Sequence, residues 1–455
     1  MDRRVRVLLR LFTAHPARTV VLAFAVAVLV GTGLLALPAA AAHGGSSGAL
    51  TSLFTAVSAV CVTGLAVVDT GAHWSGFGEG VILGLIQVGG FGIMTLASLL
   101  ALLVSGRLRL RLQLTAQAET RSLGIGQTRR VLLGVAGTTA VVELVVAAVL
   151  ALRFGVRYGR PPADAAYHGL FTAVSAFNNA GFGLDATNLT PYQRDPWVVL
   201  PVAVAVILGG LGFPVLLELL RHRHRRRAGR RAWSLHTRLT LLTTGLLLAV
   251  GTAVTCALEW TNAGTLGLFG TGDKLLNGFF AAAMTRTAGF NSIDIGALEP
   301  ATLLFSCVLM FIGGGSAGTA GGIKITTFAV LAAAIVAEVR GERDSVILGR
   351  RLSSQVLRQA LTVALLGVGL VMSATMVLLT VTDEMFEAVL FEAVSAFGTV
   401  GLTTGITTEL PASGRLVLVL LMFVGRLGPV TLVSALALRE RTRRYQLPEE
   451  RPVIG

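Results

Sequence analysis

A short polar stretch interrupts the apolar part of the sequence near residue 290. This stretch, MTRTAGFNS, runs from Met284 to Ser292 and carries hydroxyl groups, an arginine and a glycine between two long apolar segments. The sequence around it aligns without gaps with three other stretches of the chain. Each copy starts with Phe and has Gly ten positions later. The four copies are FTAVSAVCVTG from Phe54, FTAVSAFNNAG from Phe171, FFAAAMTRTAG from Phe279 and FEAVSAFGTVG from Phe391. Their spacing of 108 to 117 residues indicates an internal repeat.

The repeated stretch could bind a dehydrated cation through its backbone. Extended residues after a short helix can present carbonyl oxygens that replace the hydration shell of an ion. A glycine at the common position allows backbone angles and close approaches that a Cβ atom would hinder. The predicted ion-binding residues are Cys61, Val62, Thr63 and Gly64; Asn178, Asn179, Ala180 and Gly181; Arg286, Thr287, Ala288 and Gly289; and Gly398, Thr399, Val400 and Gly401. We call these four groups glycine segments 1 to 4.

Arg286 needs a separate interpretation, because a positive charge facing the pathway would repel a cation. It could brace its segment by bonding the backbone or an acidic group of a neighbouring repeat, or it could cap the short helix. We favour the bracing role.

The elements that position these segments follow from the lengths of the apolar runs. The part from Phe to Gly has about ten residues, so a helix there is about 15 Å long and cannot cross the ~30 Å core of a bilayer. Longer apolar runs precede the copies at 18–40, 130–152, 237–259 and 357–381, and others follow at 80–104, 196–220, 300–340 and 415–438. Each unit is therefore a span, a short re-entrant helix, an extended segment and a second span. Non-helical backbone at membrane depth is tolerated only where it is buried in protein or lines a watery cavity, and four copies around one axis would provide such a cavity.

These units predict an all-α polytopic membrane protein with four pseudo-symmetric repeats around one central pore, eight spans and four re-entrant helices. The repeats are expected at residues 1–110, 111–231, 232–350 and 351–455. The 455 residues are 53% hydrophobic and 14% charged, with a mean hydropathy of +0.75, whereas a soluble chain carries about a quarter charged residues. The run from Arg18 to about Ala40 is too long for a secretory signal, so we interpret it as a retained first helix.

The net charge of +14 is concentrated in clusters beside the apolar runs. Such clusters mark cytoplasmic loops and can contact anionic lipid, which disfavours nucleic acid as the partner. The clusters are at 107–111, 221–231, 340–351 and 439–444, besides the N-terminal MDRRVR. They predict that the N-terminus and the basic loops are cytoplasmic. The three cysteines suggest neither a disulfide framework nor a metal site, and no covalent cofactor is expected.

The third repeat contains a second polar interruption, GGGSAGTAGGIK. Each of its six glycines would destabilise a helix by about 1 kcal/mol relative to Ala. We therefore predict a broken helix, with one half ending near Ile312 and the other starting at Ile325. The related glycines in QVGGFG and ILGGLG of the first two repeats suggest bent helices or close helix packing, and close packing suffices to explain them.

The fourth repeat has Arg426 where the others have Gly90, Gly210 and Gly314. A charged side chain in mid-span is a candidate functional residue, although the loop carbonyls could also hold it in a purely structural role. Together with the glycine-rich loop it forms a predicted gate. The gate residues are Gly313, Gly314, Gly315, Ser316, Ala317, Gly318, Thr319, Ala320, Gly321, Gly322, Lys324 and Arg426.

The glycine segments and the loop together resemble the Trk/Ktr/HKT superfamily of potassium transporters, most closely the bacterial KtrB-type membrane subunit of the TrkH family. The resemblance covers nearly the whole chain. It implies K⁺ as the transported ion, selected by a filter with Gly in all four repeats and gated by the loop and Arg426. It also implies a homodimer and a cytoplasmic nucleotide-binding RCK-type regulatory subunit. The role of Na⁺ as a coupling or activating ion stays open.

Two other functions are weighed against this one. A secondary transporter of an organic solute would have two related halves and charged ligands at mid-membrane, and four re-entrant copies argue against it. An intramembrane serine hydrolase could use Ser316, since Gly314, Ser316 and Gly318 fit G-x-S-x-G. The loop also fits G-x-G-x-x-G, but neither pattern has the strand–turn–helix context that its chemistry requires. We therefore expect no enzyme activity.

Overall fold

A computed structural model describes residues 16–92, 128–225, 233–316, 318–342 and 344–428. The predicted basic clusters at 107–111 and 439–444, residues 226–231 of the cluster at 221–231, Arg343, the N-terminal MDRRVR and Ala317 lie outside the described residues. So do 93–104 and 429–438, the ends of two predicted spans. Nearly all regular structure in the described part is α-helical, as predicted.

The helices follow one order four times, which is a long helix, a short interior helix and a second helix. The long first helices are α2 (Pro16–Leu35), α8 (Thr128–Tyr158), α12 (Leu235–Glu259) and α16 (Ser354–Val381). The interior helices are α3 (Ala49–Cys61), α9 (Pro162–Phe177), α13 (Thr271–Met284) and α17 (Phe386–Gly398). The second helices are α5 (Gly76–Phe91), α10 (Pro196–Leu211), α14 (Pro300–Phe311) and α18 (Ala412–Leu427). Single turns lie in the connections at η1 (Pro38–Ala40), α4 (Thr70–His73), η3 (Thr190–Tyr192) and η5 (Ile406–Thr408).

Local capping explains where several of these helices begin. Ser75, Asp195, Ser234 and Ser353 precede α5, α10, α12 and α16, and the side-chain oxygen of each accepts a bond from a backbone N–H in the first turn. Such bonds satisfy amide groups that have no partner inside the helix. Pro196 and Pro162 occupy first-turn positions of α10 and α9, where a missing N–H costs nothing.

Packing between repeats closes the four units into a ring. The second helix of each repeat packs against the interior helix of the next, in the pairs α5–α9, α10–α13, α14–α17 and α18–α3. The interior helices are largely buried, whereas the long first helices expose apolar side chains such as Leu29, Leu152, Leu246 and Met376, which are 61–70% exposed. Apolar exposure on peripheral helices is expected where lipid is the solvent. The centre of the fold is therefore enclosed by the four interior helices.

Four described helices are long and apolar enough to cross a membrane: α2, α8, α12 and α16. A fifth span would result if α10 and α11 (Phe213–Arg225) were counted together, but they meet at an angle of 102°. The run at 196–220 can therefore still form one span, but a sharply bent one, and the expectation that packing suffices to explain its glycines is wrong. Pro214 has no N–H to offer the Gly210 carbonyl, so the helix cannot continue with full hydrogen bonding.

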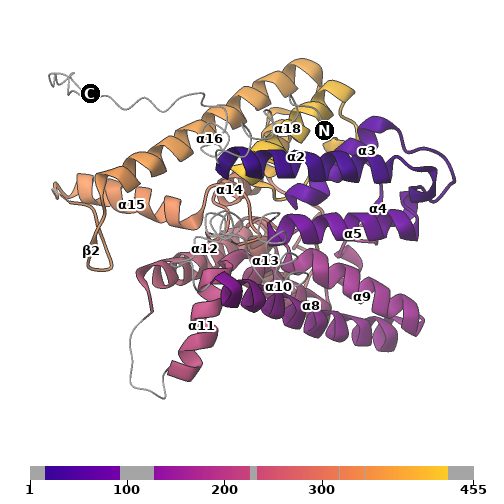
Figure 1. The fold of residues 1–455 in the computed structure, drawn as a ribbon, viewed down its shortest axis with the longest axis horizontal. Helices are drawn as coiled ribbons and strands as arrows, with labels where there is room; N and C mark the ends of the chain where they lie inside the picture. The colour runs from indigo at the N-terminus through magenta and orange to yellow at the C-terminus, as the bar shows by residue number, and fades with distance from the viewer. Residues whose placement is uncertain (1–15, 93–127, 226–232, 317, 343, 429–455) are drawn as a thin grey trace, which may run out of the picture.

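The third repeat is broken where its glycines predict. α14 ends at Phe311, α15 (Ile325–Val339) begins at Ile325, and an isolated parallel bridge joins Ile312 to Ile323 across the intervening loop. The α15–α16 connection is a two-stranded antiparallel hairpin, β1 (Val346–Ile347) and β2 (Arg350–Arg351). This hairpin projects from the end of the α15–α16 pair, away from the interior helices (Figure 1).

Candidate functional site

Each glycine segment follows the C-terminus of an interior helix and turns the backbone sharply. The second residue before the glycine has a positive φ in every copy, with values of 57° at Val62, 59° at Asn179, 81° at Thr287 and 48° at Thr399. The four glycines themselves have φ values between 67° and 93°. A left-handed backbone costs residues with a Cβ atom about 1–2 kcal/mol. Its recurrence at one position in four copies points to a functional constraint.

The four glycines approach one another in a closed ring. A Cβ atom added to each would collide with the carbonyl oxygen that precedes the glycine of the next repeat: Gly64 faces Ala180, Gly181 faces Ala288, Gly289 faces Val400 and Gly401 faces Thr63. The two widest of these separations are 2.7 Å at Gly181 and 2.5 Å at Gly289, against 3.4–4 Å for ordinary contact. The centre of the ring is therefore lined by backbone, with no space for side chains at the glycine positions.

The interior helices hold the backbone N–H groups of the glycine segments. Thr63, Ala180 and Val400 donate to Ser58, Ser175 and Ser395 carbonyls at 2.7–2.8 Å, and Ala288 donates to Met284 at 3.1 Å. The hydroxyl oxygens of Ser58 and Ser395 also accept from Gly64 N and Gly401 N, both at 3.1 Å. With the donors engaged in this way, the carbonyl oxygens are the polar backbone groups left at the ring. The C-terminal ends of the interior helices add partial negative charge beside it.

The side chains three positions before the glycines point away from this backbone ring in segments 2 and 3. The amide nitrogen of Asn178 lies 2.9 Å from Glu143 on α8. The guanidinium of Arg286 lies 3.5 Å from the Thr244 carbonyl and 3.4 Å from its hydroxyl, on α12. Both contacts are with the first helix of the same repeat. The expectation that Arg286 bonds a neighbouring repeat or caps α13 is therefore not met by its described bonds.

Glu143 and its partner Gln87 are site residues that the sequence prediction did not include. Glu143 is only 7% exposed and is the single acidic residue of the apolar run at 130–152. An acidic group in mid-span is a functional candidate by default, so this signal was available in the sequence.

Glycines in the second helices bring these helices to the ends of the interior helices. A Cβ atom at Gly89, Gly209 or Gly425 would collide with the carbonyl oxygen of Val60, Phe177 or Phe397 in the same repeat. In the third repeat the aligned glycine, Gly313, instead faces the carbonyl oxygen of Gly321 in the glycine-rich loop. In the third repeat, the loop thus lies where the end of the interior helix lies in the other repeats.

The described part of the glycine-rich loop packs mainly on the second repeat. Gly315 N donates to Gly210 O at 2.7 Å, and Thr319 N donates to Gly209 O at 3.3 Å. The Thr319 hydroxyl donates at 2.9 Å to Oδ1 of Asn179, a residue of glycine segment 2. The loop therefore supplies N–H partners to the last carbonyls of α10, whose helix breaks at this point.

The loop also contacts the fourth and first repeats. A Cβ atom at Gly321 would collide with the Thr399 hydroxyl of glycine segment 4. One N–H group of Arg426 donates a hydrogen bond to the Thr319 carbonyl of the loop, and another donates to the Gly89 carbonyl of the first repeat. Lys324 donates to the Ala320 carbonyl at 2.5 Å, within the loop. One arginine thus joins the loop to α5 and α18 beside the ring.

Within the described part of the chain, the environment of Ser316 does not resemble that of a hydrolytic nucleophile. Its hydroxyl lies 3.1 Å from the hydroxyl of Thr326 on α15. A serine nucleophile requires a basic partner, such as His, within hydrogen-bonding distance.

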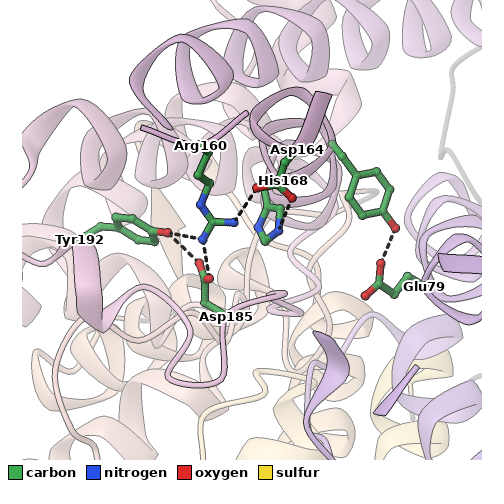
Figure 2. Close-up of polar contacts among 7 residues, drawn as sticks. Glu79, Arg160, Asp164, His168, Asp185 and Tyr192 are labelled. Atoms are coloured by element: carbon green, nitrogen blue, oxygen red, sulfur yellow. Dashed lines mark hydrogen bonds and ion pairs between the residues drawn. The ribbon is translucent and has the colours of Figure 1, made fainter. Parts of the chain in front are cut away.

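A polar network at the α8–α9 connection supports glycine segment 2 (Figure 2). Arg160 lies 2.7 Å from Asp185 and donates to the Tyr192 hydroxyl at 2.9 Å, and that hydroxyl donates to Asp185 at 2.9 Å. Burial, together with the adjacent Asp185 carboxylate, raises the pKa of Tyr192 to about 12, so its phenol remains a hydrogen-bond donor at neutral pH. Asn188 lies with Asp185 in the connection between α9 and α10, and it donates to the Gly181 carbonyl at 3.1 Å. The network thereby anchors the loop that leaves the segment.

The same region ties the first two repeats together. The Tyr167 hydroxyl donates to the carboxylate of Glu79 at 2.5 Å. Tyr167 lies on α9 and Glu79 on α5, so the bond crosses the α5–α9 contact of the ring. Asp164 lies between Arg160 and His168, 3.4 Å and 3.5 Å from them.

Comparisons with known proteins agree with this geometry. A family model described as TrkH, cation transport protein, matches residues 11–442. The Ktr system potassium uptake protein B of Bacillus subtilis (strain 168) is 39% identical, over 94% of this chain and 95% of the relative. Its namesake from Vibrio alginolyticus is 37% identical, over 96% and 94%. The crystal structure of the potassium transporter TrkH from Vibrio parahaemolyticus has a TM-score of 0.70 at 16% identity, over 92% of this chain and 84% of that chain.

These findings confirm the resemblance inferred from the sequence. The structural likeness establishes a shared fold, and the relatives are named as transport proteins, so the prediction that the chain is not an enzyme holds. Its long apolar helices and its relatives identify a multi-pass plasma-membrane protein. Because the family model matches almost the whole sequence, the chain belongs to the TrkH family of cation transport proteins.

Proposed function

We propose that this chain takes up K⁺ across the bacterial plasma membrane, driven by the ion gradient and the membrane potential. The observation that carries the proposal is the closed ring of four glycines, each packed against the carbonyl of the next repeat. Carbonyl oxygens can replace the water around a dehydrated cation. Relatives that cover nearly the whole chain are named potassium uptake proteins, which supports K⁺ as the cation.

The ion-binding residues in this proposal are glycine segments 1 to 4, acting mainly through their backbone. Glycine at all four positions keeps the carbonyl ring free of side chains, a condition that favours K⁺ selection. Arg286 acts as a brace on α12 rather than as a ligand, because its guanidinium bonds Thr244. Whether Na⁺ couples to or activates transport is a separate question, which the flux measurement below addresses.

The glycine-rich loop and Arg426 form the gate in this proposal. The loop lies beside glycine segments 2 and 4 and is held by Arg426 through the Thr319 carbonyl. Few of its side chains are large enough to anchor it, so it can adopt a second position. A positive charge beside the pathway also raises the barrier to a cation.

Control of this gate falls to other chains. We infer that the protein works as a homodimer with a cytoplasmic nucleotide-binding RCK-type subunit, as the family resemblance implies. The basic run at 221–231 then faces the cytoplasm, where it can contact this partner or anionic lipid headgroups. Eight spans result if each of the four repeats crosses the membrane twice.

The function is tested by rescue of growth. A bacterium that lacks its own K⁺ uptake systems should grow at low external K⁺ when it expresses this chain with its regulatory partner. Purified protein in liposomes should then carry K⁺ in preference to Na⁺, and adding Na⁺ would reveal any coupling. Transport of neither ion by correctly folded protein would refute the proposed function.

Orientation is tested by cysteine labelling. A cysteine introduced in the run at 221–231 should not react in intact cells with a membrane-impermeant thiol reagent, whereas Asp383→Cys in the α16–α17 connection should react. The background should be low because all three native cysteines are buried. Strong labelling of the basic run from outside would invert the proposed topology.

A further inference from the structure

A buried carboxyl group lies directly behind glycine segment 2, and it has no role in the proposed function. Glu143 is near the middle of α8 and is 7% exposed. Its described partners are two neutral side-chain amides, Gln87 from α5 of the first repeat and Asn178 from the segment itself. Burying a carboxyl group at membrane depth is costly, so its retention there calls for a role.

The three side chains form a closed triangle of hydrogen bonds. Asn178 Nδ2 donates to Glu143 Oε1 at 2.9 Å and to Gln87 Oε1 at 2.8 Å. Gln87 Nε2 in turn donates to both oxygens of Glu143, at 3.1 Å and 3.2 Å. The oxygens of Glu143 accept from the NH₂ groups of both amides, so both amides direct these groups towards it. Glu143 therefore determines which way the Asn178 amide is turned.

The orientation of Asn178 is coupled to the backbone of the segment. Asn178 is 1% exposed, and its Nδ2 also lies 2.9 Å from the Val174 carbonyl in the last turn of α9. Its Oδ1 fills the space left by Gly90 on α5, where a Cβ atom would overlap it. Only Asn179 and Ala180 separate it from Gly181 of the ring. A rotation of the amide would thus press on α5 or release the end of α9.

Glycine segment 3 is also held by a polar side chain that points away from the ring. Arg286, at the aligned position of segment 3, bonds Thr244 on the first helix of its own repeat. Cys61 and Gly398 occupy this position in segments 1 and 4 and carry neither an amide nor a guanidinium group. Two of the four segments are thus held from outside by polar side chains, and segment 2 is held by the only carboxylate among these contacts.

We propose that Glu143 is a positioning residue for ion selection, which holds glycine segment 2 at the spacing that favours K⁺ by fixing the amide of Asn178 against Gln87. This inference rests on the proposed function, since it presumes that the ring selects K⁺. Glu143 touches no part of the ring and acts through Asn178.

The test compares Na⁺ and K⁺ flux in liposomes for the parent and two variants. Glu143→Gln replaces one acceptor oxygen by an NH₂ group that faces the donors of Gln87 and Asn178. Its Na⁺/K⁺ permeability ratio should rise roughly three- to fivefold, as expected for the partial loss of the hydrogen bonds that fix the Asn178 amide. The double variant Gln87→Glu/Glu143→Gln exchanges the acid and the amide and keeps two acceptors for Asn178. It should restore a ratio close to that of the parent.

Glu259→Gln is the matched control. Glu259 is fully buried at the end of α12 and accepts bonds from Asn262, Thr265 and the Glu299 amide, away from the glycine segments. Its neutralisation should leave the permeability ratio unchanged, even if it lowers thermal stability.

Each outcome decides between the inference and its alternatives. An unchanged ratio in folded Glu143→Gln protein would overturn the inference, while a K⁺-selective parent in the same assay would leave the proposed function standing. If the single variant fails to fold, the exchanged double variant decides: a parental ratio supports the inference, and an altered ratio in folded protein rejects it. A parent that does not prefer K⁺ would refute the proposed function instead.

Discussion

Gly64→Ser is expected to raise the Na⁺/K⁺ permeability ratio by roughly tenfold, an effect equivalent to ~1.4 kcal/mol of ion discrimination. Gly64 has a φ of 93°, and a Cβ atom added to it would collide with the carbonyl oxygen of Ala180. A serine there must displace this oxygen or the backbone of segment 1. Either movement changes the spacing of carbonyls on which discrimination between cations of different size depends.

The measurement compares Na⁺ flux and K⁺ flux in liposomes that contain the chain, and it yields the Na⁺/K⁺ permeability ratio. Gly84→Ser is the matched control, because Gly84 lies on α5 with nothing within 4 Å of an added Cβ atom. The ring arrangement predicts a comparable effect for Gly401→Ser, whose Cβ atom would collide with the Thr63 carbonyl. If folded Gly64→Ser protein keeps the parental ratio, glycine segment 1 is not part of an ion filter.

Arg426→Ala is expected to increase K⁺ flux by roughly tenfold in liposomes that contain this chain without any regulatory partner. Hydrogen bonds to charged groups contribute about 1.5–3 kcal/mol each. Removing Arg426 releases the Thr319 carbonyl of the loop and the Gly89 carbonyl of α5. It also removes a positive charge beside the pathway. Both changes favour an open loop over the closed one.

Two further variants make this prediction specific. Arg415→Ala removes another arginine of α18, one that bonds the Leu410 and Thr408 carbonyls at the far end of the helix, and should leave flux unchanged. Deletion of Gly315 to Gly318 removes part of the loop and should increase flux as Arg426→Ala does. If both gate variants fold and conduct no faster than the parent at matched protein incorporation, the loop and Arg426 are not the gate.

Much of the fold could be predicted because it rests on local demands of the backbone. The four copies, their glycines and their flanking apolar runs are visible in the residues themselves, and a ten-residue helix cannot cross a bilayer whatever surrounds it. The glycines of the third repeat likewise predict the break before Ile325, since so many would destabilise a helix. The break after α10 was missed, although Pro214 provided a local signal for it.

The contacts of the candidate site depended on the tertiary structure. The sequence identified Arg426 as exceptional but not its acceptors, which lie 107 and 337 residues away in the chain. It likewise gave no partner for Arg286, whose bonds go to Thr244 within its own repeat. The triangle around Glu143 joins α5, α8 and glycine segment 2, and no periodicity relates positions 87, 143 and 178. Repetition and backbone preference are properties of short stretches of chain, whereas a buried side chain pairs with whatever group the packed helices bring within 3 Å of it.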